Sequence, residues 1–316
     1  MSKPKVLVIV GPTAAGKTSL SITLAKQFAG EVISADSRQV YTGMDLGTGK
    51  VTAEEMAGVP HHLLDVVSPT TTYTASDFAA DGANAIETIQ NNGHLPIIAG
   101  GTFFYIDMLL GRSSTPEVPP NKALRAELET LTIEELFAQL EAADPARAKT
   151  IDKHNARRII RSLEIIAALG KVPNDLREEP YDVLTIGIDI DKETLHRNIH
   201  VRLLERLEQG MVAEVEELLA QGVSHERLED LGLEYRYLSR YLRGELTYVE
   251  MVEQLESKTR QFAKRQMTWL KRDQSIHWIK PADLERIYTT VHNFLNNKPC
   301  DLLESDMLKT SRSERN

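Results

Sequence analysis

"KVLVIVGPTAAGKT", residues 5–18, determines the fold class of this chain. Its first six residues form an apolar run typical of a fully buried strand. The pattern G-x-x-x-x-G-K-[ST] follows over residues 11–18 and leads into a helix expected over residues 17–28. In such a loop, backbone N–H groups and a lysine surround phosphate groups. The stretch therefore predicts a phosphate-binding loop between the first strand and the first helix of an α/β protein.

Strand and helix patterns alternate after the loop. Further strands are expected at 31–36, around 62–67, at 95–101, at 181–190 and at 275–280. A helix is expected over 74–93, and helical patterns fill 192–272 and the stretch up to about 295. This alternation predicts a mostly parallel sheet with helices on both faces.

The rhythm breaks at "STPEVPPN", residues 114–121, and a predominantly helical stretch follows. We expect a P-loop NTPase-like α/β core with added C-terminal helices (residues 1–118 and 181–297), a helical insertion (119–180) and a disordered tail (298–316). The polar composition of the tail, which has no long apolar period, supports the last expectation.

Charge and cysteine content limit the possible partners and the compartment. The 37 basic and 46 acidic residues give a net charge of −9, which argues against broad non-specific binding of nucleic acid. A nucleic-acid partner would need local basic patches. The single cysteine, Cys300, excludes an intramolecular disulfide and fits a reducing cytoplasm. No apolar run approaches the roughly 20 residues of a membrane span, so no membrane partner is expected.

The loop residues have distinct expected roles. Gly11 and Gly16 let the backbone turn, Lys17 adds a charge, and Thr18 can ligate Mg²⁺. Within the loop, the expected phosphate-binding residues are Gly11, Thr13, Ala14, Ala15, Gly16, Lys17 and Thr18. The alternative is a glycine-rich turn with an incidental lysine. A second metal-holding acid could be Asp36 or Asp65, but neither closes a long hydrophobic run with an acidic pair, so the loop alone does not identify a kinase.

Four further stretches narrow the choice. They are "ISADSRQVYTGMDLGTGKVTAEE" (33–55), "VPHHLLDVVSP" (59–69), "PIIAGGTFFYI" (96–106) and "TRQFAKRQMTWLKRD" (259–273). With "GPTAAGKT", they resemble the tRNA dimethylallyltransferase family over the chain to about residue 280. The resemblance implies transfer of the prenyl group of dimethylallyl diphosphate to N6 of adenosine 37, beside the tRNA anticodon. The loop would then hold the diphosphate of the prenyl donor, with Mg²⁺ as cofactor and no obligate protein partner.

The resemblance also assigns roles within the reaction. Asp36 is implied as the general base that takes the N6 proton, and an ionised aspartate suits that role at neutral pH. Alternatively, Asp36 could ligate magnesium or cap a helix. Thr102 is implied to bind the bridging oxygen or the diphosphate, although Thr also favours helix N-caps. Lys17 completes the expected catalytic set. Ser37, Arg38 and Gln39, with Asp36, suit the edge of a flipped-out base.

Two basic stretches are candidates for contact with the anticodon stem-loop of tRNA. On the helix expected over 154–166, Arg157, Arg158 and Arg161 cluster opposite an apolar face. Residues 257–272 carry cations and no acid, with Phe262 and Trp269 interleaved. The expected tRNA-binding cations there are Lys258, Arg260, Lys264 and Arg265. The alternative for both stretches is a merely solvated charged face.

One position departs from the family pattern. The family often has two arginines four apart where this chain has Asn198 and Arg202. Arg202 is therefore a candidate diphosphate ligand, and Arg197 could substitute from the adjacent position.

Three other functions stay open at this point. They are an isopentenyltransferase acting on free adenine nucleotides, a P-loop small-molecule kinase or ATPase, and a non-catalytic RNA-binding protein. The insertion and the basic 257–272 stretch argue against the first, since a small substrate needs neither. Intact Lys17, Thr18, Asp36 and Thr102 argue against the last.

Overall fold

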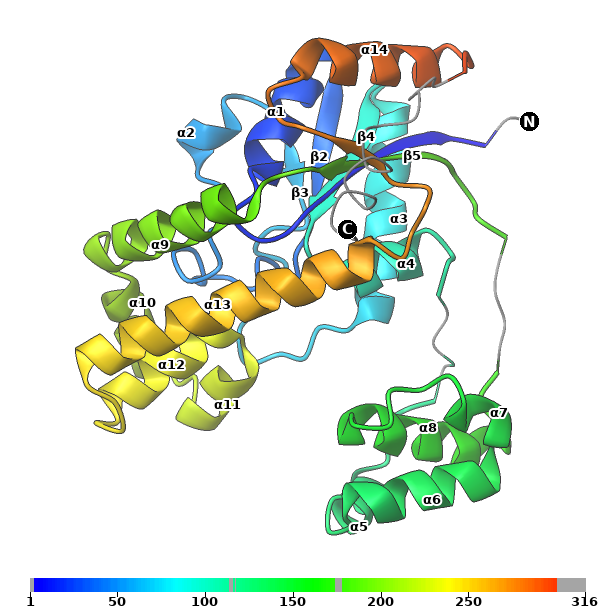
Figure 1. Cartoon of the computed structure of the whole chain (residues 1–316), viewed down its shortest axis with the longest axis vertical. Helices are drawn as coiled ribbons and strands as arrows, with labels where there is room; N and C mark the ends of the chain where they lie inside the picture. The colour runs from blue at the N-terminus through cyan, green and yellow to red at the C-terminus, as the bar shows by residue number, and fades with distance from the viewer. Residues whose placement is uncertain (1–2, 114–115, 117, 174–177, 300–316) are drawn as a thin grey trace, which may run out of the picture. The chain divides into compact units, whose positions relative to one another are not determined.

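The computed structural model describes residues 3–113, 116, 118–173 and 178–299. The chain forms two compact units (Figure 1). One spans Met1–Leu110 and Glu179–Asn316, and the other spans Gly111–Glu178. The second unit thus begins somewhat earlier than the insertion expected at 119–180. Residues 300–316 of the expected disordered tail lie outside the described residues.

A six-stranded sheet in the order β3-β2-β4-β1-β5-β6 lies at the centre of the first unit. Its strands are β1 (Lys5–Val10), β2 (Gly30–Ala35), β3 (His61–His62), β4 (Leu95–Gly100), β5 (Asp182–Ile188) and β6 (His277–Ile279). All neighbouring strands are parallel, which confirms the expected α/β sheet. Val10 pairs in register with Gly100, so the carboxyl ends of β1 and β4 lie side by side.

Helices cover both faces of the sheet because successive strand residues point to opposite sides. On β1, Val6 and Val8 belong to one apolar cluster, and Leu7 and Ile9 belong to the other. The helices α1 (Lys17–Gln27) and α14 (Leu284–Leu295) pack on the face of Leu7. The face of Val6 packs against α3 (Ala75–Asn91) and α4 (Phe103–Leu109), as Figure 1 shows.

The third expected strand is much shorter than the sequence pattern indicated. Around 62–67 the chain forms only β3, because Leu63 and Asp65 adopt positive φ angles of 62° and 55°. A left-handed residue turns the backbone out of a strand ladder. Further along, Val67 forms an isolated parallel bridge with Tyr41, outside the strands of the sheet. A short helix, α2 (Ala53–Met56), lies between β2 and β3.

Five helices form most of the C-terminal part of the first unit. They are α9 (Lys192–Glu208), α10 (Met211–Ala220), α11 (His225–Asp230), α12 (Leu233–Leu242) and α13 (Tyr248–Leu270). A capping box between Thr247 and Glu250 starts α13. Its buried side chains recur every three to four residues: Met251, Leu255, Thr259, Ala263, Gln266 and Leu270. The polar Gln266 in this otherwise largely apolar row has a role in the site described below.

The second unit is helical, as expected. Its helices are α5 (Lys122–Leu128), α6 (Ile133–Ala143), α7 (Pro145–Ala148) and α8 (Ala156–Leu169). Ile159, Ile160 and Leu163 of α8 lie in its own apolar core with Leu136 and Leu140. Across the described residues of both units, no helix has the length and apolar character needed to cross a membrane.

Candidate active site

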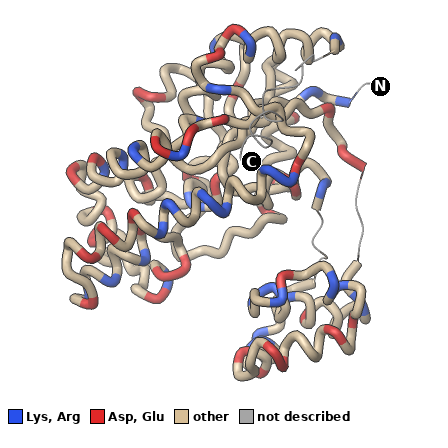
Figure 2. Tube along the Cα trace, viewed as in Figure 1, with Lys and Arg blue, Asp and Glu red and all other residues tan. Residues whose placement is uncertain are grey.

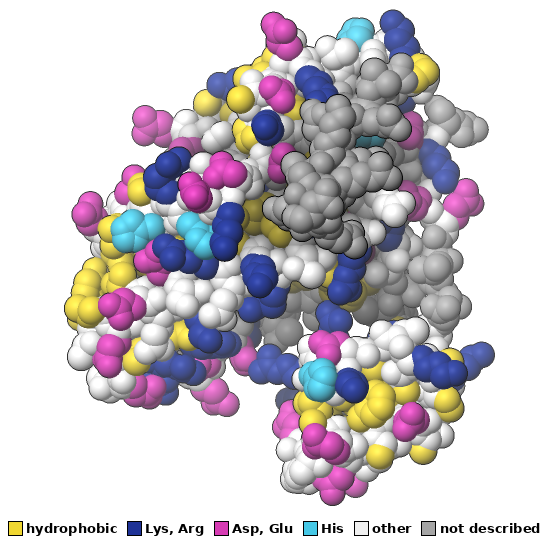
Figure 3. All heavy atoms as spheres, viewed as in Figure 1, with side chains coloured by type: hydrophobic (Ala, Val, Ile, Leu, Met, Phe, Trp, Pro, Cys, Tyr) yellow, Lys and Arg dark blue, Asp and Glu magenta, His cyan; other side chains and the backbone are white. Residues whose placement is uncertain are grey.

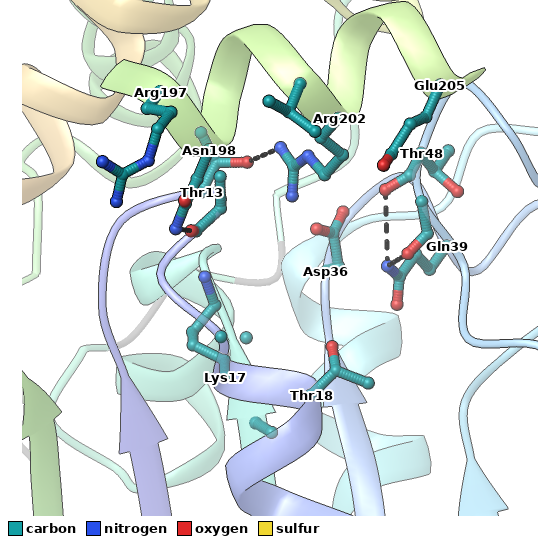
Figure 4. Close-up of a pocket in the computed structure, with 16 residues that line it drawn as sticks. Thr13, Lys17, Thr18, Asp36, Gln39, Thr48, Arg197, Asn198, Arg202 and Glu205 are labelled. Carbon is teal, nitrogen blue, oxygen red and sulfur yellow. Dashed lines mark hydrogen bonds between the residues drawn. The ribbon is translucent and has the colours of Figure 1, made fainter. Parts of the chain in front are cut away.

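A cavity of about 440 Å³ opens at the carboxyl edge of the sheet, next to the phosphate loop (Figure 4). Ligands of open α/β sheets bind at this edge, where the loops that follow the strands diverge. The charged side chains around the cavity are Lys17, Asp36, Arg197, Arg202 and Glu205. Of the expected loop residues, Thr13, Ala14, Gly16 and Thr18 also line it, whereas Gly11 and Ala15 are buried behind it.

The conformation of the phosphate loop corrects one expectation. Ala14 and Gly16 adopt left-handed angles, with φ of 63° and 90°, whereas Gly11 does not. Gly11 is instead needed for close packing, because a Cβ there would lie 3.2 Å from the Cβ of Ile188. Gly16 precedes α1 without a side-chain cap. The first N–H groups of that helix can therefore bind an anion.

Lys17 lies at the centre of the loop. Its Nζ donates to the carbonyl oxygens of Pro12 at 2.8 Å and Gly11 at 3.1 Å. Burial, and to a smaller extent the nearby Arg202, lower the pKa of Lys17 to about 8, while Asp36 opposes the shift. A cation this poorly hydrated is best stabilised by an incoming anion.

Helix α9 supplies a second cation and a loop contact. The guanidinium of Arg202 donates to Thr13 Oγ1 at 2.5 Å, and Asn198 Nδ2 donates to the carbonyl oxygen of Ala14 at 3.2 Å. Burial first, and then Arg206, lowers the pKa of Arg202 to about 10, so it stays charged at neutral pH. Arg197 lines the cavity as an exposed side chain (Figure 4). The arrangement makes Arg202 a cavity cation, whereas Asn198 holds the loop backbone.

Asp36 follows β2 and faces the same cavity as Lys17 and Thr18 (Figure 4). Its Oδ1 accepts from the backbone N–H of Arg38 at 2.9 Å, which stabilises a turn and caps no helix. The hydroxyl of Thr18 and the carboxylate of Asp36 are oxygen donors of the kind that Mg²⁺ prefers. The other acid considered, Asp65, forms an ion pair with Lys50 and does not line the cavity.

Thr102 lies beside this group but does not line the cavity. It precedes α4 without making a side-chain cap. Its Oγ1 instead accepts from the backbone N–H of Ser37 at 3.0 Å, next to Asp36. The glycines before it permit close packing, since a Cβ on Gly100 would lie 2.1 Å from the carbonyl oxygen of Ala35. Thr102 therefore positions the turn that carries Asp36.

Gln39 lines the cavity, but its amide group is engaged within the protein. Its Nε2 donates to Gly49 O at 3.1 Å, and its Oε1 accepts from Ser34 at 2.8 Å. The expected contact of Gln39 with a base edge stays a prediction. A residue that the sequence reasoning missed supports the same loop: Glu214 accepts the backbone N–H groups of residues 45–47 and the hydroxyl of Tyr235.

The basic stretch on α13 divides into exposed and paired cations. Lys258, Lys264 and Arg265 are exposed, and Arg265 lies 5.9 Å over the ring of Phe262. Arg260 is instead ion-paired with Glu256 one turn earlier on the helix. Blue segments follow one another along α13 in Figure 2, and basic side chains gather there in Figure 3. Arg260 therefore differs from the other three cations in having a counter-ion within the helix, and the tRNA contact of all four stays a prediction.

The arginines of α8 differ in exposure. Arg157 and Arg158 are exposed. Arg161 is half-buried, donates to Val118 O at 2.8 Å and pairs with the fully buried carboxylate of Glu164, which also binds Arg125. Arg161 therefore stabilises the second unit from within, in contrast to the expected exposed cluster of three.

These features define a P-loop α/β protein with a cavity lined by three cations and two carboxylates. The family model for IPP transferase matches residues 39–273. A tRNA dimethylallyltransferase of Thermomicrobium roseum is 42% identical over 88% of this chain and 87% of the relative. One of Shouchella clausii is 38% identical over 94% of this chain and 99% of the relative. The chain belongs to the IPP transferase family.

Solved structures agree with this assignment. The full-length tRNA isopentenylpyrophosphate transferase of Bacillus halodurans matches with a TM-score of 0.69 and 33% identity, and all of both chains is covered. A eukaryotic dimethylallyltransferase acting on tRNA matches with a TM-score of 0.81 and 28% identity over 94% of this chain and 80% of the other.

Proposed function

We propose that this protein is a tRNA dimethylallyltransferase that moves the prenyl group of dimethylallyl diphosphate to N6 of adenosine 37 in tRNA. The observation that carries the proposal is one cavity in which Lys17 and Arg202 lie with the carboxylate of Asp36. Two cations suit a diphosphate leaving group, and a carboxylate suits removal of a proton. Family membership and the relatives named above support this function over a kinase or a free-nucleotide transferase.

The donor diphosphate binds at the phosphate loop in this proposal. The N–H groups at the start of α1 and the side chains of Lys17 and Arg202 stabilise the charge that develops as diphosphate leaves. Arg197, exposed at the cavity rim, can add a third cation. Because both inner cations are desolvated, their interaction with the departing oxygen is stronger than it would be in water.

The chemical step exchanges one bond for another. The N6 nitrogen of adenine forms a bond with C1 of the dimethylallyl group while the C1–O bond to diphosphate breaks. Asp36 accepts the proton that N6 loses, and the electron pair of the broken bond leaves with diphosphate. Thr102, through its bond to Ser37 N, fixes the backbone next to Asp36.

Mg²⁺ fits the oxygen donors of this site. Thr18 is the residue that would hold it, and the remaining ligands would come from diphosphate and water. When bound, the ion neutralises charge on the leaving group.

The anticodon stem-loop binds through exposed cations in this proposal, and the reaction takes place in the cytoplasm. On the first unit these cations are Lys258, Lys264 and Arg265 of α13. On the second unit they are Arg157 and Arg158 of α8. Because the whole chain carries −9, phosphate attraction depends on such local patches.

Mass spectrometry of tRNA nucleosides after incubation with the protein, dimethylallyl diphosphate and Mg²⁺ tests the proposal. The expected product is adenosine that is heavier by one dimethylallyl group, at position 37, together with one diphosphate per transfer. ATP should not be consumed. Stoichiometric release of ADP, or modification of free adenosine monophosphate but not tRNA, would contradict the proposal.

A further inference from the structure

Gln266 of α13 makes two hydrogen bonds that no apolar residue of its row could make. Its Oε1 accepts from the backbone N–H of Thr13 in the phosphate loop at 2.8 Å. Its Nε2 donates to the carbonyl oxygen of Gly101, before Thr102, at 3.1 Å. The two partners leave the amide only one orientation, since one is a donor and the other an acceptor. The side chain is 6% exposed, so both bonds lie away from bulk water.

The two loops that Gln266 joins leave neighbouring strands. The ladder between β1 and β4 ends at the pair Val10 and Gly100, and beyond that pair the chains diverge. Past the end of the ladder, the amide of Gln266 bridges the two chains through Thr13 and Gly101. The fit is close, because a Cβ on Gly101 would lie 2.6 Å from Gln266 Nε2 and 3.9 Å from Lys17 Nζ.

The same helix contacts the loop a second time. Ala263, one turn before Gln266, packs with Leu195 and Ile199 of α9 and with the methyl group of Ala14. The tip of the phosphate loop is thus held against α9 and α13. The exposed side of α13 at the same level carries Lys264 and Arg265.

We propose that Gln266 is a positioning residue, which sets the phosphate loop at a fixed separation from the Gly101–Thr102 turn. On one side of it lies the loop that holds the diphosphate, and on the other lies the turn that holds Ser37 beside Asp36. Gln266 therefore aligns the leaving group with the base that receives the proton. This inference rests on the proposed function.

Two variants and a control on the same helix test the proposal. Gln266→Leu removes both hydrogen bonds at similar volume. Gln266→Glu keeps the acceptor for Thr13 but donates to Gly101 only when its carboxyl group is protonated. Gln254→Leu changes an exposed glutamine of α13 that lies before the basic stretch. For each protein, kcat, both KM values and Tm are measured from pH 6 to 8.5.

Gln266→Leu is expected to lower kcat by about 10- to 100-fold, because small displacements of reacting groups cost about this much. The KM for tRNA should stay within about threefold of wild type, since the exposed cations are unchanged. For Gln266→Glu, the ratio of its kcat to that of wild type should rise as the pH falls, because protonation restores the second bond. Gln254→Leu should match wild type.

Three results would overturn the proposal. A raised KM for tRNA with unchanged kcat would make Gln266 a direct RNA contact. A kcat loss that follows Tm in both variants would make it a packing residue. A kcat of Gln266→Glu equal to that of wild type across this pH range would show that the bond to Gly101 is not needed, and this test stands even if Gln266→Leu does not fold. Failure of the wild-type protein to transfer any prenyl group would instead overturn the proposed function, and the inference with it.

Discussion

The cavity at the phosphate loop and the exposed side of α13 are both cationic, but they hold their charges differently. Lys17 and Arg202 are half-buried in the cavity wall, and desolvation there lowers the pKa of each. Lys264 and Arg265 are exposed, where salt screens their charge. A desolvated pair can stabilise a charge that develops at one atom, whereas exposed cations attract a polyanion along its length. An acidic chain can therefore bind two anions by two separate means.

The largest effect should come from Asp36→Asn, which removes the proposed base and leaves both cationic regions intact. We expect transfer to fall by about 10²–10⁴-fold, as is typical of general-base removal. Single-turnover rates with saturating tRNA measure the change, and binding of the donor to the variant serves as control. Turnover near that of wild type with unchanged Mg²⁺ dependence would exclude Asp36 as the base.

The pH dependence of donor capture should distinguish the buried cations from the exposed ones. Lys17 must be protonated to bind diphosphate, and its pKa of about 8 in the free protein predicts that kcat/KM for the donor falls as the pH rises through 8. The loss should approach tenfold per pH unit. The Lys17→Arg variant keeps its charge over this range, so its kcat/KM for the donor should begin to fall only at a higher pH. A wild-type profile flat to pH 9.5 would contradict the proposed role.

Loss of the two exposed cations Lys264 and Arg265 should weaken tRNA binding without changing donor binding. The log–log salt dependence of the tRNA Kd should become shallower by roughly 0.7–0.9 for each phosphate that is no longer neutralised. Filter binding at several salt concentrations measures both quantities. The double variant Lys26→Ala/Lys280→Ala removes the same charge from exposed positions elsewhere. If that control weakens tRNA binding to the same extent, the effect of Lys264 and Arg265 comes from the net charge of the protein and not from contact between α13 and tRNA.

The second unit should show a similar but separate contribution. Arg157→Ala/Arg158→Ala removes two exposed cations of α8 and should reduce the salt slope by a comparable amount if both reach phosphates. The buried Glu164 and its partners are untouched, so circular dichroism should show an intact helical unit. Unchanged affinity and slope at two salt concentrations would mean that this helix face is only solvated.

The smallest effect on tRNA binding should come from Arg260→Ala. Arg260 is paired with Glu256, so its loss removes a cation that is already neutralised locally. We expect a salt slope within error of wild type, in contrast to Lys264→Ala on the same helix. A slope change equal to that of Lys264→Ala would show that the ion pair opens when RNA binds.

Much of the molecule could be predicted from local patterns. The apolar run 5–10 and the loop that follows it predicted β1, the phosphate loop and α1. Both signals depend only on residues that are adjacent in the chain. The strand expected around 62–67 was wrong beyond His62. Nothing in "LLDVV" signals the positive φ of Leu63 and Asp65, which non-glycine residues adopt only when tertiary contacts hold them there.

The sequence by itself determined the fold class, the family and the position of the phosphate loop, since each depends on residues that are close in the chain. Only the tertiary structure decided which polar side chains face a cavity or the surface and which are engaged within the protein. Arg161 and Arg260 are paired, Gln39 supports a loop, and Gln266 joins two loops from 253 and 165 residues away. A hydrogen-bond partner so distant in the chain leaves no periodic or local signal, because the folded backbone alone brings the two groups within about 3 Å.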